Sequence, residues 1–79
     1  MNNVLDSENF SNQGRRYYLD ILQAKSTKPY LKITRIDLHK NEPAQRKNVI
    51  FFEDDFFFLA EGIAMLLGRY TSGQLGQNT

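Results

Sequence analysis

The segment from residue 15 to residue 35, RRYYLDILQAKSTKPYLKITR, constrains the fold of this chain most. It contains two runs of alternating character, separated by a short polar connection at residues 25–29. Side chains two residues apart in a β-strand point to the same face of a sheet. The pattern therefore predicts two strands, with one face fit to cover a core and an opposite face of rings and cations. The first face carries Tyr17, Leu19, Ile21, Leu31 and Ile33, and the second carries Arg16, Tyr18, Asp20, Leu22, Tyr30, Lys32 and Thr34.

The face of rings and cations has the composition of a platform for single-stranded nucleic acid. Aromatic rings stack on bases, and cations neutralise phosphates. The predicted contact residues, which include two lysines of the polar connection, are Arg16, Tyr18, Lys25, Lys28, Tyr30 and Lys32. The alternative is an ordinary solvated face whose long side chains cover apolar surface.

The size of the chain limits how much core it can build alone. Seventy-nine residues make one small domain, and 41% of them are apolar, which is too many for a disordered chain. A domain of this size buries only about 60–65% of the surface that its unfolded chain exposes. The sequence has no cysteine, which excludes disulfides and thiolate metal sites. Association between copies is therefore the expected way to bury the many Phe and Tyr rings.

The N-terminal segment, MNNVLDSENF, has no basic region followed by an apolar run, so it does not read as a secretory signal. The longest mostly apolar run, residues 56–67, contains Glu61 and is too short to span a bilayer. A cytoplasmic protein without membrane contact is expected.

Charge is distributed unevenly along the chain. The net charge is +1, yet residues 15–47 carry nine basic and three acidic residues, a net charge of +6. Residues 48–79 carry one basic and four acidic residues, a net charge of −3. A basic middle next to an acidic C-terminal third is typical of a polyanion-binding sheet backed by an acidic helix.

The order of expected elements gives an α+β fold, a four-stranded antiparallel twisted sheet followed by one C-terminal helix. Gly14 marks a turn between the first two strands, since glycine supplies positive φ. Strands are expected over residues 4–10, 15–24, 30–37 and 47–52, and a helix over residues 54–70. Residues 1–70 then form the domain, and residues 71–79, TSGQLGQNT, form a flexible tail.

The expected helix carries more apolar side chains than one face can hold. Its main stripe runs from Phe56 through Leu59 and Ile63 to Tyr70, at helical spacing. Other apolar or small side chains fall outside or at the edge of this stripe, and a single copy would leave them wet. We expect them to meet a second copy, together with two residues of the last strand. The predicted dimer interface is Phe57, Phe58, Gly62, Met65, Ile50 and Phe52.

Several segments in this order resemble a repeat of the PUR family, the purine-rich-element binders, in the short single-repeat form found in bacteria. The segments are Arg15–Ile21 (RRYYLDI), Tyr30–Thr34 (YLKIT), Val49–Phe56 (VIFFEDDF) and Glu61-Gly62. The resemblance covers about residues 4–70.

The resemblance implies two intertwined copies of a ββββα repeat that bind single-stranded DNA or RNA, often G-rich, through the sheet. A chain with one repeat would then act as a homodimer. Many nucleic-acid-binding repeats carry a Lys and then an Asn near the end of the strand that matches residues 15–24. This chain has Leu22 and Ala24 there.

Catalysis has little support in the sequence. Asp54 and Asp55 are explained by the start of a helix, where carboxylates meet the positive end of the helix dipole. His39 stands alone in a polar connection, and no Gly-rich phosphate loop or metal-loop spacing is present. The sequence therefore predicts a non-enzymatic protein with no cofactor, no metal and no small-molecule substrate.

Two function classes remain open. The first is a homodimer that binds single-stranded nucleic acid, and the second is a homodimeric protein–protein interaction module that uses Tyr18, Ile50 and Phe52. Salt separates them, because each phosphate neutralised on a single strand contributes about 0.7 to the slope of log affinity against log salt. The sequence does not distinguish DNA from RNA, since no element specific for a 2′-hydroxyl is identifiable.

Overall fold

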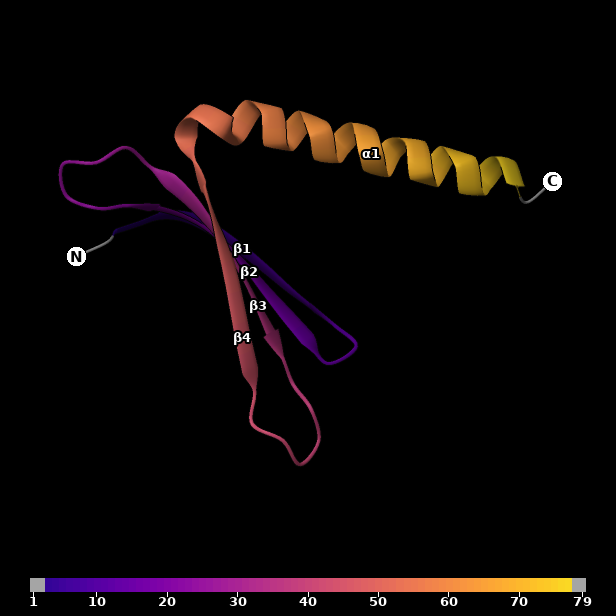
Figure 1. The fold of residues 1–79 in the computed structure, drawn as a ribbon, viewed down its shortest axis with the longest axis horizontal. Helices are drawn as coiled ribbons and strands as arrows, with labels where there is room; N and C mark the ends of the chain where they lie inside the picture. Colours follow the sequence, from indigo (N-terminus) through magenta and orange to yellow (C-terminus); the bar gives the residue numbers. More distant parts are fainter. Residues whose placement is uncertain (1–2, 78–79) are drawn as a thin grey trace.

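The computed structural model describes residues 3–77, and the side chains of residues 3–73. Four strands form one antiparallel sheet in chain order, and one helix follows (Figure 1). The elements are β1 (Asn3–Asn12), β2 (Arg15–Gln23), β3 (Tyr30–Asp37), β4 (Gln45–Phe52), a short 3₁₀ turn η1 (Glu53–Asp55) and α1 (Phe56–Gln77). The predicted α+β class and the order of its elements are confirmed.

Local turn chemistry explains how the strands connect. Gln13 and Gly14 both have positive φ, 50° and 80°, as a two-residue hairpin loop of type I′ requires. The Leu38 N–H, just after β3, donates a hydrogen bond to the Gly14 carbonyl at 2.8 Å. The first hairpin is therefore tied to the end of β3.

Strand pairing assigns each side chain to one of two sheet faces, because residues directly opposite each other share a face. The helix face carries Leu19, Ile21, Leu31 and Ile33, which line a cavity of about 320 Å³ with four side chains of α1. The platform face is the opposite one, and its paired residues lie in four cross-strand rows. These rows are Leu22–Tyr30–Phe52, Asp20–Lys32–Ile50, Tyr18–Thr34–Asn48 and Arg16–Ile36–Arg46, in the order β2–β3–β4.

Helix α1 leaves the end of β4 and extends away from the sheet at a wide angle (Figure 1). Phe56, Leu59, Ala60 and Ile63, all from its first two turns, line the cavity against the helix face. The molecule is consequently long and flat, with extents of 53 × 40 × 15 Å. The helix forms an arm above an open wedge and does not cover the sheet.

The helix limits differ from those expected from the sequence. The acidic residues Glu53–Asp55 form the 3₁₀ turn, and α1 begins at Phe56 and ends at Gln77. It therefore continues through most of the residues assigned to a tail after position 70. No proline interrupts residues 71–77, and each glycine there costs a helix only about 1 kcal/mol relative to alanine.

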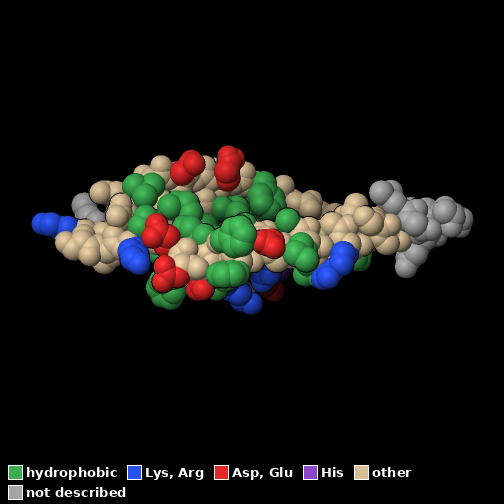
Figure 2. All heavy atoms as spheres, turned by 90° about the horizontal axis from the view of Figure 1, so that it is seen from above, with side chains coloured by type: hydrophobic (Ala, Val, Ile, Leu, Met, Phe, Trp, Pro, Cys, Tyr) green, Lys and Arg blue, Asp and Glu red, His purple; other side chains and the backbone are tan. Residues whose placement is uncertain are grey.

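A single copy buries almost nothing completely. Among the described residues no apolar side chain is buried, and Thr34, at 4% exposure, is the one buried polar residue. Viewed from above, hydrophobic side chains lie open over the middle of the molecule with acidic side chains beside them (Figure 2). Phe57 and Phe58, for example, are 69% and 72% exposed. The expectation that one copy leaves rings wet is confirmed.

Candidate nucleic-acid interface

The platform face is built by β2, β3 and β4, and its width comes from the antiparallel register. Tyr18 lies opposite Thr34, and Lys32 lies between Asp20 and Ile50. Three cations and one carboxylate stand in the four rows, at Arg16, Lys32, Arg46 and Asp20. The face therefore combines rings with a net positive charge, which suits a polyanion that carries stacking bases.

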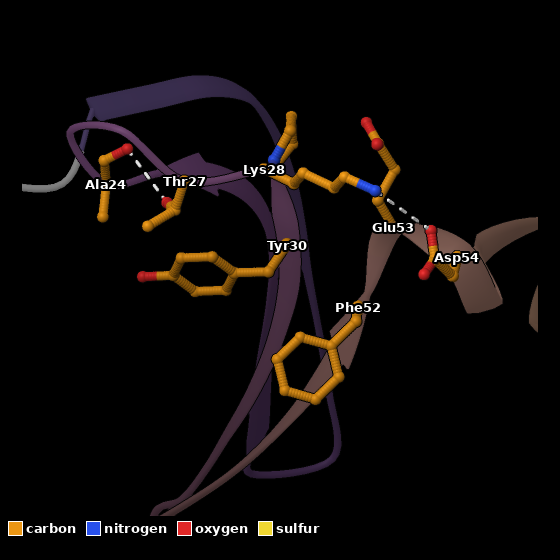
Figure 3. Close-up of a pocket in the computed structure, with 8 residues that line it drawn as sticks. Ala24, Thr27, Lys28, Tyr30, Phe52, Glu53 and Asp54 are labelled. Atoms are coloured by element: carbon orange, nitrogen blue, oxygen red, sulfur yellow. Dashed lines mark hydrogen bonds and ion pairs between the residues drawn. The ribbon is translucent and has the colours of Figure 1, made fainter.

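A hollow of about 450 Å³ lies at one end of the platform face. Tyr30 and Phe52 are direct cross-strand partners, and their rings point to the same side of the sheet (Figure 3). The β2–β3 loop and the start of η1 complete the wall. The lining residues are Ala24, Thr27, Lys28, Pro29, Tyr30, Phe52, Glu53 and Asp54.

The β2–β3 loop that borders the hollow is held by three hydrogen bonds. Thr27 donates from both its N–H and its hydroxyl to the Ala24 carbonyl, at 3.2 and 2.9 Å. The Gln23 side-chain amide donates to the Thr27 carbonyl at 2.9 Å. Ser26 has φ 68°, which completes the tight reversal. The loop that carries Lys25 and Lys28 is thus fixed to the end of β2.

One cation at the hollow has an acidic partner. The Lys28 ammonium lies 3.7 Å from Asp54 Oδ1, and both side chains are well exposed (Figure 3). An exposed pair of this kind contributes little stability and is weakened by salt. Lys28 is therefore available to exchange Asp54 for a phosphate.

The structure brings the predicted contact residues together only in part. Arg16, Tyr18, Tyr30 and Lys32 share the platform face, as the alternation predicts. Tyr18 and Tyr30 lie two rows apart, which corresponds to roughly 13 Å along the strands. Lys28 lines the hollow, whereas Lys25 lies exposed in the same loop and does not line it.

The residues predicted to form the dimer interface fall on two different surfaces. Phe57, Phe58, Gly62 and Met65 lie on α1 and are exposed. Ile50 and Phe52 lie on the platform face, at 46% and 66% exposure, and Phe52 is a wall of the hollow. A single dimer contact that included both groups would therefore cover part of the platform face.

Three residues of this surface have no nucleic-acid role in the prediction from sequence. Phe52 is predicted there as a dimer or partner contact, and Arg46 and Asn48 have no predicted role. Alternation predicts only that the even-numbered residues of β4, from Arg46 to Phe52, share one face. Which face this is follows from the β3–β4 register, in which Tyr30 pairs with Phe52 and Ile36 pairs with Arg46. That register depends on the length of the connection after β3, which alternation alone does not reveal.

Three further features bear on function: metal-binding groups, membrane-spanning helices and similarity to other proteins. The part of the chain that the structure describes contains no group of three or more His, Asp or Glu arranged to hold a metal ion. None of its helices combines the length and the apolar character needed to cross a membrane. No family model, no curated protein and no solved structure matches the chain.

Proposed function

We propose that this chain binds single-stranded nucleic acid through its platform face, as a homodimer. The observation that carries the proposal is the hollow between Tyr30 and Phe52, which has Lys28 at its rim and Lys32 one row away. Two neighbouring rings offer a stacking surface for bases, and the adjacent cations meet phosphates. The resemblance to PUR repeats supports the same assignment.

The homodimer part of the proposal rests on apolar surface that one copy leaves open. The arm of α1 and the helix face of the sheet border a wedge that a second copy can fill (Figure 1). A stable interface of this kind buries about 1,600 Å² or more. Sedimentation should show a dimer at micromolar concentration, and a folded monomer at about 100 μM would contradict this part.

Fluorescence anisotropy with labelled G-rich and C-rich single strands, at two salt concentrations, tests the binding. Each stacking ring contributes about 1–3 kcal/mol by alanine substitution, so Tyr18→Ala and Tyr30→Ala should each weaken binding at least several-fold. Tyr17→Ala is the matched control, since Tyr17 neighbours Tyr18 on β2 but lies on the helix face, paired with Arg35. Thermal melts of each variant separate lost binding from lost folding.

The two lysines of the β2–β3 loop are expected to act on phosphates. Lys25→Ala and Lys28→Ala should lower the salt slope and leave sequence preference nearly unchanged, because phosphate contacts carry no base information. A wild-type protein that binds no single strand at about 50 mM salt would overturn the nucleic-acid assignment.

A protein–protein interaction module is the second candidate, and one observation favours it. Leu22, Ile50 and Phe52 place three apolar side chains at the same end of the platform face, two of them exposed. A mostly apolar interface responds weakly to salt, whereas a phosphate-dependent one weakens steeply. The salt titration therefore distinguishes the two candidates.

A further inference from the structure

The four rows of the platform face form a track along β3. Successive rows are two residues apart, so the distance from the Tyr30 row to the Ile36 row is about 20 Å. A stacked strand advances about 3.4 Å per nucleotide, so the track accepts on the order of six nucleotides. The hollow with its rings occupies one end of this track, and two arginines, Arg16 and Arg46, occupy the other.

The middle of the track is its most closely packed part. Thr34 is the most buried residue among those described, and it lies between Tyr18 on β2 and Asn48 on β4. Because Thr34 is only 4% exposed, neighbouring side chains close over it, and the Tyr18 and Asn48 side chains form the accessible surface here. The Asn48 amide has both donors and an acceptor to offer base edges, a chemistry that Leu22 and Ala24 do not supply.

The far end is suited to a phosphate. Arg16 and Arg46 lie on either side of Ile36, which places their backbones two strand spacings, roughly 10 Å, apart. Both arginines are exposed, and Arg16 Nε donates a hydrogen bond at 3.3 Å to the hydroxyl of Ser11, its partner on β1, on the side away from Arg46. This bond is exposed, so Arg16 can exchange the hydroxyl for a phosphate. Neither the row of the two arginines nor the adjacent row, Tyr18–Thr34–Asn48, contains an acidic residue. Two guanidinium groups that flank a gap of this width can converge on one phosphate, and each can bind it bidentately.

We infer that a single strand lies along β3, with a base stacked in the Tyr30–Phe52 hollow and a phosphate held at the far end by Arg16 and Arg46. This inference rests on the proposed function. It adds the course of the bound strand along β3, the number of nucleotides bound, and a role for Arg46, which has no role predicted from the sequence. It places the strand on the platform face only.

Adjacent residues of β4 provide the test. Arg46 and Lys47 are both exposed and both cationic, but Arg46 pairs with Ile36 on the platform face and Lys47 pairs with Arg35 on the helix face. Arg46→Ala and Lys47→Ala thus remove the same charge at nearly the same place. Only the first removes a group from the track.

Affinity is measured for wild type and both variants with oligothymidylates of two to ten nucleotides, each at several salt concentrations. With strands longer than the track, Arg46→Ala should weaken binding about five- to tenfold and lower the salt slope by about 0.7. With the dinucleotide, which reaches only the hollow, the same variant should bind as wild type does. Lys47→Ala should match wild type at every length, within about twofold.

Equal losses for the two variants would overturn the track, because they would show a diffuse charge effect on either face. A loss with Arg46→Ala that does not depend on strand length would overturn it as well. Both results leave the proposed function standing, since the wild type still binds. A wild type that binds no strand of any length instead ends the proposed function, and the track with it.

Discussion

Lys28 and Asp54 join the β2–β3 loop to the 3₁₀ turn η1, which precedes the helix arm, by an ion pair of 3.7 Å between Nζ and Oδ1. The two residues lie at the rim of the hollow that Tyr30 and Phe52 line. The pair therefore holds a cation at the proposed base site while neutralising part of its charge. Removing the Asp54 carboxylate breaks the ion pair, so that its contribution to stability and its effect on binding can each be measured.

Asp54→Asn should strengthen binding to single strands at low salt, because Lys28 is released and a carboxylate near the phosphates is lost. Stability should fall by less than about 1 kcal/mol, since both side chains are largely exposed. Anisotropy titrations at two salt concentrations and urea unfolding measure the two effects. Asp55→Asn is the control, because Asp55 lies in the same 3₁₀ turn and is not a lining residue of the hollow. Equal gains from both variants would show only a change of net charge.

The backbone geometry of the first hairpin predicts that substitution of Gly14 lowers the free energy of unfolding. Gly14 has φ 80°, and a methyl group added to it would lie 3.2 Å from the Leu38 carbonyl oxygen. Gly14→Ala should therefore destabilise the fold by about 1–2 kcal/mol, measured by urea unfolding. Gly68→Ala makes the same change at a position on α1 where the added methyl meets nothing within 4 Å apart from the local helix backbone. A neutral Gly14→Ala would contradict the type I′ geometry of this turn.

The sheet was predictable because its signals are local. Alternation in residues 15–23 and 30–37 reports directly which side chains share a face, and β3 matches its expected limits, Tyr30–Asp37. Gly14 marked the turn because few other residues adopt positive φ without strain. The assignment of Arg16, Tyr18, Tyr30 and Lys32 to one face follows from the same period of two.

The remaining features depend on information that the pattern lacks. The pairing of Tyr30 with Phe52 and of Ile36 with Arg46 is set by where the long β3–β4 connection brings the chain back. The continuation of α1 from residue 71 to Gln77 is not predicted, because the Gly- and Gln-rich composition of this segment favours a flexible tail, although the cost of glycine in a helix is modest. The angle of the helix arm depends on packing between elements, and helical spacing reports only which side chains share a face.

The small residues of the arm test where a second copy packs. Gly62 and Gly68 both have open space around an added methyl in the single chain, so alanine at either position should stabilise an isolated helix by about 1 kcal/mol. Gly62 belongs to the proposed interface, and a second copy that approaches α1 closely at this position would clash with an added methyl group. Gly62→Ala should therefore raise the dimer dissociation constant measured by sedimentation, whereas Gly68→Ala should leave it unchanged or lower it. The same effect from both variants would remove Gly62 from the interface.

The rings of the arm give the most direct test of assembly. Phe58 is 72% exposed in one copy, so its truncation should be nearly neutral if the chain is a monomer. If a second copy buries the ring, Phe58→Ala should cost about 3–5 kcal/mol, as truncation of a core phenylalanine does.

Leu38→Ala is the matched control, because Leu38 is 51% exposed in the β3–β4 connection, away from the arm. Urea unfolding at two protein concentrations supplies the readout, since the midpoint of a dimer rises with concentration. We expect that rise for the wild type, a large loss for Phe58→Ala and a small one for Leu38→Ala. A midpoint independent of concentration, together with a neutral Phe58→Ala, would show that the arm stands free in a monomer.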